Sequence, residues 1–273
     1  MTLIAAAGDV VLMKPLRHPT GSLLGVLRDV DVFAANLEVP LTKVVDPQRG
    51  GLVLHGDPEL VEDLARLGLD VVGLANNHLG DHGWGPLREL AERLEARRMA
   101  AIGIGSEAGE AVRPRRVGGV GFIAASAVSP AQFLATDDRP GMAGAAGDED
   151  VERLLGAVAA AREAGPVAVL MHWGVPHVAE VQPDQRELAR RLAQAGASAI
   201  FGAHSHGLQE VEEIAGVPVF YGLSSLVFQY QGPGADRFGR ETAIALVDLD
   251  PIGRATSWRL ERGRLDENGE PVR

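Results

Sequence analysis

Short apolar runs alternate with amphipathic stretches along most of the chain, and this alternation predicts strands separated by helices. Each run is only a few residues long, as expected of a buried strand. The runs are Leu3–Ala7, Val30–Ala35, Leu69–Leu74, Ala100–Ile104, Val120–Ala125, Val167–Met171 and Ala197–Phe201. The order of the elements therefore predicts an α/β fold.

Four stretches between these runs carry the signals of helices. They are Pro58–Leu67, Pro86–Arg98, Asp148–Ala164 and Pro183–Ala195. Asp57 precedes the first stretch, and aspartate is a favoured residue at a helix N-terminus, with proline following it. Gly68, Gly165 and Gly196 come after three of the stretches, where glycine commonly ends a helix. The residues next to these stretches thus indicate where the first helix begins and where three of the helices end.

Two later regions are typical of antiparallel strand pairs. Val112–Ala127 contains Gly118-Gly119 between two apolar stretches, and Leu208–Leu223 contains Ala215-Gly216 in the same position. Closing strands are predicted at Thr242–Leu249 and Thr256–Leu260. A mixed sheet is therefore expected in place of a purely parallel one.

The chain is expected to form one domain over residues 1–261, followed by a loose polar tail over 262–273. Residues 128–147 are rich in Ala, Gly, Pro and Asp, which predicts a surface loop that could act as a lid. The apolar N-terminus lacks a basic region and is interrupted by Asp9, unlike a signal peptide. No run is long enough to span a membrane, so we expect a cytoplasmic protein without a membrane anchor.

Composition narrows the classes of partner and site. Of 273 residues, 46% are hydrophobic and 23% are charged, as in soluble globular proteins. The net charge of −11 disfavours nucleic acids and anionic membrane surfaces as partners. The absence of cysteine excludes disulfides, thiolate metal sites and a cysteine nucleophile. A metal ion would have to be held by His, Asp, Glu and Asn.

Polar residues follow five of the predicted strands at the point where each strand ends. Ligands of open α/β sheets bind at the carboxyl ends of the strands. The five segments are Gly8-Asp9, Asn36-Leu37-Glu38, Asn76-Asn77-His78, His172-Trp173-Gly174 and His204-Ser205-His206. Their nitrogen and oxygen donors suit Mn, Fe or Zn. On an extended segment, His204 and His206 would point to the same side.

Each of these residues also has a purely structural interpretation. Asp9 could cap a turn, and Asn76 and Asn77 could form one, since asparagine tolerates a left-handed backbone. His172 could be a core histidine with satisfied hydrogen bonds, and Glu38 could be a solvated loop acid. Their joint occurrence at successive strand ends favours a metal site over five unrelated structural roles.

A series of ordered motifs extends from about Leu3 to Phe228 and includes these strand ends. The motifs are Gly8–Leu12, Asn36–Thr42, Ala75–His78, His172–Gly174 and Gly202–His206. Together they resemble the CapA-type capsule-synthesis proteins. These proteins are linked to poly-γ-glutamate biosynthesis and belong to the calcineurin-like metallophosphatase superfamily. The resemblance implies a four-layer α/β/β/α sandwich with mixed sheets and two divalent transition metal ions (Mn, Fe or Zn).

The resemblance also implies a role for each polar strand end. His78 would be the catalytic histidine that contacts the substrate oxyanion or the leaving group. The metal ligands would be Asp9 and His206 on the first ion, Glu38 on both, and Asn77, His172 and His204 on the second. Apart from the resemblance, further substrate or supporting contacts are expected from Asn36, Asn76, Asp81, Trp173 and His177, with Asp81 close enough in sequence to orient His78 and Trp173 adjacent to His172. For His177, a solvated loop histidine is the alternative.

Three positions depart from the pattern of the resemblance. The superfamily usually carries a histidine where this chain has Val11, so one metal ion would have one ligand fewer. The family's Gly-Asn after the late Tyr-x-Leu reads Ser224-Ser225, and acidic residues after His-Trp-Gly are replaced by Val175-Pro176-His177. We therefore expect a more loosely held ion on the His206 side and altered substrate contacts.

The implied activity is hydrolysis by a metal-bound hydroxide, with a phosphoester as the first expectation. An amide such as a γ-glutamyl linkage, hydrolysed or transferred, is the first alternative. A non-catalytic accessory protein in capsule or poly-γ-glutamate synthesis is the second. In each case, the partner would be a small molecule or polymer that carries phosphate or carboxylate groups.

Overall fold

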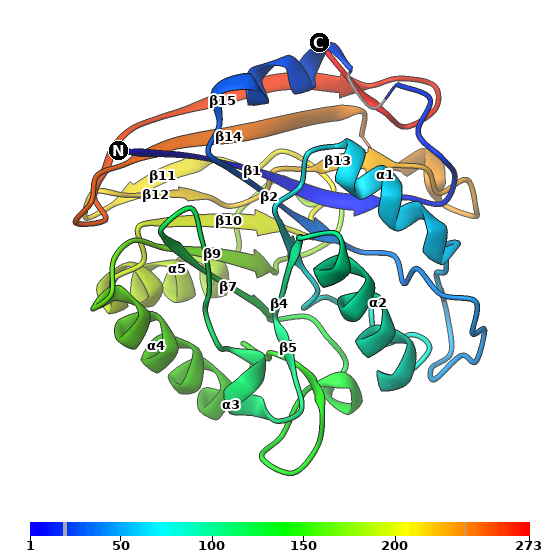
Figure 1. Ribbon diagram of the computed structural model, residues 1–273, viewed down its shortest axis with the longest axis horizontal. Helices are drawn as coiled ribbons and strands as arrows, with labels where there is room; N and C mark the ends of the chain where they lie inside the picture. Colours follow the sequence, from blue (N-terminus) through cyan, green and yellow to red (C-terminus); the bar gives the residue numbers. More distant parts are fainter. Residues whose placement is uncertain (19–20, 238) are drawn as a thin grey trace.

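Two mixed sheets lie face to face in the middle of the molecule, and helices cover their outer sides (Figure 1). The computed structural model describes residues 1–18, 21–237 and 239–273 of the chain. Strands of the two sheets contact one another across the interior, including β1 with β10 and β2 with β9. The expected four-layer α/β/β/α sandwich is confirmed.

The first sheet combines a parallel half with an antiparallel half. In spatial order it contains β16 (Pro271–Val272), β15 (Ala255–Leu265), β14 (Glu241–Leu249), β1 (Thr2–Val11), β2 (Val32–Leu37), β3 (Val71–Gly73) and β4 (Ala100–Ile102). Strands β1 to β4 pair in parallel, whereas β14 to β16 are antiparallel. The short strand β13 (Ser225–Phe228) pairs in parallel with the end of β1, beyond the part that β14 covers.

The second sheet contains both predicted hairpins. Its order is β11 (Val211–Ile214), β12 (Val217–Phe220), β10 (Ala199–Ala203), β9 (Val167–His172), β7 (Val120–Ser126) and β6 (Arg115–Val117). The pairs β6–β7 and β11–β12 are antiparallel, while β7, β9, β10 and β12 are mutually parallel. The prediction of a mixed sheet is therefore confirmed.

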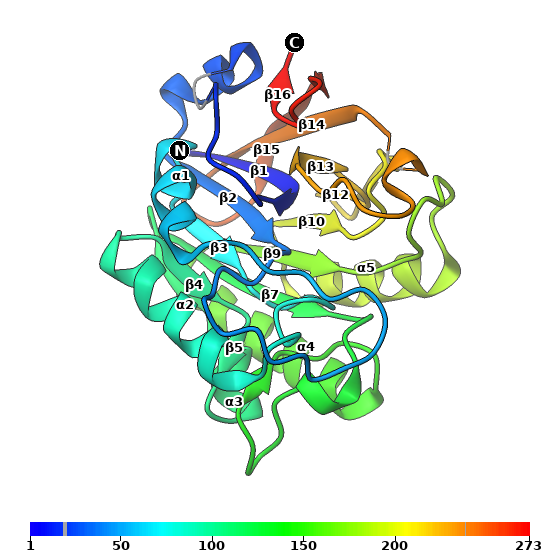
Figure 2. The same ribbon diagram turned by 90° about the vertical axis from the view of Figure 1, so that its right-hand side faces the viewer.

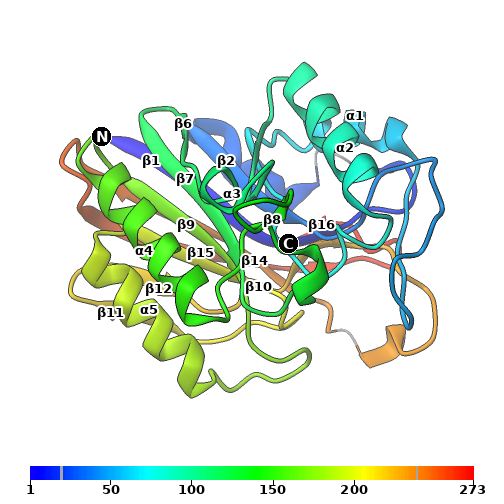
Figure 3. The same cartoon turned by 90° about the horizontal axis from the view of Figure 1, so that it is seen from below.

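The predicted helices lie on the outer sides of the sheets, where their apolar faces are buried. They are α1 (Val61–Arg66) after a 3-10 turn at Pro58–Leu60, α2 (Trp84–Ala96), α4 (Asp148–Arg162) and α5 (Pro183–Ala195). Figure 3, seen from below, shows α4 and α5 side by side on the near side of the second sheet. A 3-10 helix at Ser22–Asp29 covers β15 and β16, and α3 (Ala108–Ala111) is a single turn. None of the helices in the described ranges has the length and apolar composition needed to cross a bilayer.

The expectation of a loose tail after residue 261 is wrong. Residues up to Leu265 continue β15, and Pro271–Val272 pair with it as β16. The buried carboxylate of Glu270 accepts hydrogen bonds from the backbone amides of Arg17 and His18, at 2.7 Å each. The exposed side chains of β15 lie mainly in its first half, at Thr256–Arg259, whereas Leu265 and Glu270 in the expected tail are buried.

The predicted surface loop over residues 128–147 is partly ordered into short elements. It contains a 3-10 turn at Ala131–Phe133 and the strand β8 (Gly141–Met142), which pairs with β5 (Ile104–Gly105). A further 3-10 turn lies later in the chain, at Ala235–Arg237.

Candidate metal centre

The carboxyl ends of the central strands meet at one side of the two sheets. Figure 2 shows the arrowheads of β1, β2, β9 and β10 gathered there. The polar residues at or just after these ends are buried together. This group includes Asp9, Asn36, Glu38, Asn76, His172, His204 and His206.

A bulge in β1 positions Asp9. The register of β1 shifts around this residue against both β2 and β13, and such irregularities redirect a side chain. Gly8 permits the bend, because a Cβ atom there would lie 1.8 Å from the carbonyl oxygen of Ser224. The carboxylate of Asp9 is fully buried and accepts hydrogen bonds from Asn36 Nδ2 at 2.7 Å and from the amide of His204 at 2.9 Å.

His204 and His206 do not lie on an extended segment, so that expectation is wrong. Strand β10 ends at Ala203, and the two histidines follow with φ angles of 90° and 50°. Left-handed backbone is unfavourable for residues with a Cβ, and such strain is typical of functional sites. The turn still brings both imidazoles into the site, with ring centroids 6.1 Å apart.

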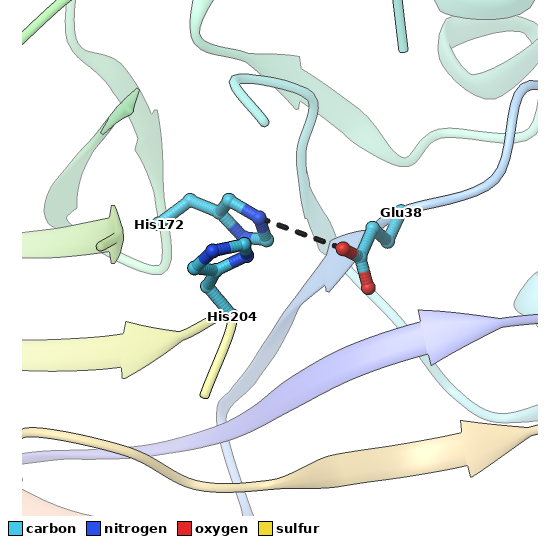
Figure 4. Close-up of side chains that lie close together, drawn as sticks. All are labelled: Glu38, His172 and His204. Carbon is cyan, nitrogen blue, oxygen red and sulfur yellow. Dashed lines mark ion pairs between the residues drawn. The ribbon is translucent and has the colours of Figure 1, made fainter. Parts of the chain in front are cut away.

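Two groups of potential ligands share one carboxylate. Glu38, His172 and His204 form the first group, and Asp9, Glu38 and His206 form the second; within each group the ligand atoms lie within 4.8 Å of one another. His172 Nε2 is 3.6 Å from Glu38 Oε1, and His206 Nε2 is 3.6 Å from Glu38 Oε2. Figure 4 shows Glu38 opposite the imidazoles of His172 and His204. Glu38 thus faces histidines with both oxygens.

The side chain of Glu38 has the environment of a metal ligand. It is 1% exposed, and neither carboxylate oxygen has a hydrogen-bond partner among the described residues. A buried carboxylate without a partner is costly unless a cation lies against it. His204 Nδ1 is likewise buried without a partner in the described ranges, and Asn77 Oδ1 lies 2.7 Å from His172 Nε2. These donors fit a divalent metal ion.

The pKa values of the buried groups also favour a metal-binding site. Burial, together with the negative charges of Asp9 and Asp81, raises the pKa of Glu38 well above its ordinary value. Burial also lowers the pKa of His172 well below its ordinary value, and it lowers the pKa of both His204 and His206 to about 3. Histidines that stay neutral at physiological pH are ready to bind metal, because a protonated imidazole cannot.

The metal-free protein is expected to lose stability as the pH falls from about 6.5 towards 3. The unfolded histidines have a pKa near 6.5, against about 3 for folded His204 and His206, so the unfolded state binds more protons in this window. Glu38 acts in the opposite sense, because its raised pKa stabilises the fold at low pH. The three histidines outnumber it, so we expect a loss of roughly 1.4 kcal/mol per pH unit or more.

Urea unfolding in the presence of a chelator, followed by tryptophan fluorescence at several pH values, would measure this loss. Replacing both His204 and His206 with Gln should flatten the profile over the same window. An equally steep profile in the double variant would show that other groups cause the acid sensitivity.

His78 lies near these ligands, and its ring contacts Asp81, the residue expected to orient it. Its Nδ1 atom is 2.9 Å from Asp81 Oδ2, and the carboxylate of Asp81 is fully buried. The sequence did not indicate Arg49, whose Nε lies 2.6 Å from Asp81 Oδ1 and whose Nη2 lies 2.8 Å from His78 Nδ1. Arg49 is a lone arginine in a polar loop, and no pattern in the sequence distinguishes it.

The two predicted supporting asparagines lie in one hydrogen-bond network. Asn76 Nδ2 donates to Asn36 Oδ1 at 3.1 Å and to the carbonyl of Leu37 at 2.7 Å. Asn36 Nδ2 in turn reaches Asp9 and lies 3.3 Å from His172 Nδ1. This network fixes the ends of β1, β2 and β9 relative to one another.

Of the other two residues expected to contact the substrate or support the site, Trp173 is buried in the core and His177 lies at the edge of the site. Trp173 is 1% exposed, stacks on Tyr221, and donates from Nε1 to the carbonyl of Tyr221 at 2.9 Å. It therefore packs in the core, with almost no exposed surface to offer a substrate. The ring of His177 stacks on His206, with centroids 6.1 Å apart, so His177 borders the site.

The departure at Ser224-Ser225 has a structural consequence. Ser224 has a φ of 60°, a conformation that suits the glycine expected there from the resemblance. Ser225, where the resemblance leads us to expect Asn, has its Oγ 3.2 Å from His206 Nδ1. The sequence identified the substitution, and the structure places it directly beside a candidate ligand.

Comparison with known proteins identifies the family of this chain. Residues 3–230 match the sequence profile of the family described as "Bacterial capsule synthesis protein PGA_cap". The chain belongs to this family. As a PGA_cap member, it is 28% identical to the PGA biosynthesis protein CapA of Bacillus subtilis over 74% of its length and 54% of that protein. It is 31% identical to a probable polyglutamine synthesis accessory protein of Mycobacterium tuberculosis, over 83% of its length and 64% of the relative.

The PGA_cap chain therefore spans between half and two thirds of the length of these relatives. Among solved structures, a 5'-nucleotidase precursor from Thermus thermophilus resembles it with a TM-score of 0.55 at 17% identity, covering 96% of this chain and 54% of the other. This similarity confirms the calcineurin-like fold that the sequence resemblance implied.

Proposed function

We propose that this PGA_cap chain is a metal-dependent hydrolase that holds two divalent ions and acts on a phosphoester. The observation that carries the proposal is Glu38, a buried carboxylate that faces a histidine with each oxygen and lacks a hydrogen-bond partner among the described residues. A single shared carboxylate between two donor groups is the arrangement expected of a bridged pair of ions.

Each side chain has a defined task in this proposal. One ion would be held by Asp9, Glu38 and His206, and the other by Glu38, Asn77, His172 and His204. When bound, the ions would activate water and neutralise negative charge on the reacting group. His78 turns Nδ1 towards Asp81 and so presents its opposite ring edge, Nε2, for a hydrogen bond to the leaving group.

Metal analysis combined with aryl phosphate assays tests the proposal. We expect near-stoichiometric transition metal in the purified protein and hydrolysis of 4-nitrophenyl phosphate or bis(4-nitrophenyl) phosphate when Mn²⁺ is added. His78→Ala should keep the metal and lose activity by about 100-fold, the low end for removal of a general acid. Failure of the wild-type protein to bind any transition metal would refute the proposal.

An accessory role in polymer synthesis is the second candidate, favoured by the names of two relatives, a PGA biosynthesis protein CapA and a probable polyglutamine synthesis accessory protein. Under this hypothesis, the fold would bind a carboxylate-rich polymer or a synthesis partner without cleaving a bond. Partner capture that survives replacement of both His204 and His206, with no activity on phosphoesters or γ-glutamyl amides, would favour it. Cleavage of a γ-glutamyl amide but not of phosphoesters would instead identify the metal centre as an amidase or transferase site.

A further inference from the structure

Arg49 contacts both members of the His78–Asp81 pair. It lies in the segment between β2 and the 3-10 turn at Pro58, and 21% of its side chain is exposed. Its Nε forms an ion pair with Asp81 Oδ1 at 2.6 Å, while Nη2 lies 2.8 Å from His78 Nδ1 and donates to the carbonyl of Leu52 at 2.7 Å. A simple counter-ion for Asp81 would need only the first of these contacts.

The segment that carries Arg49 is fixed on both sides of this residue. The amide of Gln48 donates to the carbonyl of Asp81 at 2.8 Å, and the amide of Leu54 donates to Asp81 Oδ2 at 2.9 Å. Buried His82 bridges the two ends of the segment, since its Nδ1 accepts from the amide of Asp46 and its Nε2 lies 2.9 Å from the carbonyl of Leu54. The guanidinium of Arg49 is therefore placed by a rigid support.

This arrangement bears on which nitrogen of His78 carries hydrogen. Guanidinium has donors and no acceptor, so the contact of Arg49 Nη2 favours an Nδ1 that accepts and an Nε2 that carries hydrogen. Asp81 Oδ2 favours the opposite tautomer, because a carboxylate only accepts. Arg49 opposes this preference because its Nη2 donates to the same ring nitrogen, and a nitrogen that carries hydrogen has no lone pair to accept with.

We propose that Arg49 is a positioning residue that holds Asp81 and His78 so that His78 directs an Nε2–H group towards the leaving group. The proposal rests on the hydrolase function proposed above, because it assigns His78 a donor role. Arg49 itself does not contact the reacting atoms. It acts through the orientation and tautomer of His78.

A leaving-group series measures the effect on catalysis. Arg49→Gln is expected to reduce kcat/KM by about 10-fold for 4-nitrophenyl phosphate and by about 100-fold for phenyl phosphate, because a poorer leaving group depends more on a donor. Arg49→Lys, which can pair with Asp81 but cannot reach both partners, should fall between wild type and Arg49→Gln. In a His78→Ala background, Arg49→Gln should cause no further loss.

A matched control lies in the same segment. Lys43→Gln also removes one positive charge, but the ion pair of Lys43 with Asp57 is largely exposed, so activity and leaving-group dependence should stay at the wild-type values. Metal content and melting temperature, measured for every variant, separate loss of the fold from loss of positioning. An equal loss in Arg49→Gln for all leaving groups, with full metal content, would overturn the proposal.

Nitrogen NMR of His78 tests the same proposal without any enzyme assay. In ¹⁵N-histidine-labelled protein loaded with Zn²⁺, long-range ¹H–¹⁵N spectra should show hydrogen on Nε2 in the wild type and a shift towards Nδ1 in Arg49→Gln. The same tautomer in both proteins would refute the proposal. Because this measurement needs no turnover, it stays decisive if the protein proves not to hydrolyse phosphoesters.

Discussion

Replacing Glu38 with Gln is expected to reverse the stability order of wild type and variant when metal is added. Without metal, at pH 8, the variant should be more stable by about 1–3 kcal/mol, because the buried carboxylate has no partner among the described residues and an amide costs less to bury. With Mn²⁺ at 100 times its dissociation constant, the wild type should gain about 2.7 kcal/mol per ion bound. The variant should gain far less, since Glu38 belongs to both ligand groups.

Thermal melts with chelator and with added metal measure this crossover. For a chain of this size, the gain corresponds to about 5–10 °C in the melting temperature of the wild type for each ion bound. Glu270→Gln is the matched control, because Glu270 is equally buried but accepts two backbone hydrogen bonds. Relative to the wild type, the Glu270→Gln variant should lose the same amount of stability with metal as without it. A Glu38→Gln variant stabilised by Mn²⁺ as much as the wild type would remove Glu38 from the ligand set.

The candidate ligands could be predicted from the sequence because each lies where a buried strand ends. Periodicity locates the strand, and the parallel order brings the ends together, so Asp9, Glu38 and His172 converge without any knowledge of loops. His204 and His206 converge for a different physical reason. They follow β10 in a left-handed turn, and their alternation on a strand, which suggested convergence, does not exist.

The residues that sequence reasoning missed lie in segments without periodicity. Arg49 reaches His78 only because a loop is folded back by contacts of Gln48, Leu54 and His82, and nothing local indicates those contacts. The ordered end of the chain was missed because long-range contacts hold it: the buried carboxylate of Glu270 accepts from the amides of Arg17 and His18, and Pro271–Val272 pair with β15. Tertiary contacts place Arg49 and order the end of the chain, and the local pattern of apolar and polar residues does not reveal such contacts.

Stepwise removal of metal is expected to empty the site of His206 before the site of His172 and His204. The first group offers four protein donors when Asn77 is included, whereas the second offers three. At Val11, where the superfamily has a histidine, the side chain is apolar and buried, and β1 pairs there with Phe228, whose ring packs edge-on against His206. Fewer donors mean weaker binding, so the metal on this side should exchange faster and bind about 10-fold or more weakly, the scale of losing one supporting contact.

Anomalous diffraction from crystals soaked in graded chelator would give the occupancy of each site separately. His206→Ala should leave one tightly bound ion per chain, whereas His204→Ala should lower the affinity of the ion that wild type holds last. Both variants remove one imidazole from the same turn, so a general disturbance of that turn should affect both equally. A difference between the two variants therefore reports on the metal sites. A crystal in which the His206 site is full and the site of His172 and His204 is empty would contradict the predicted order and show that the two carboxylates, Asp9 and Glu38, outweigh the number of donors.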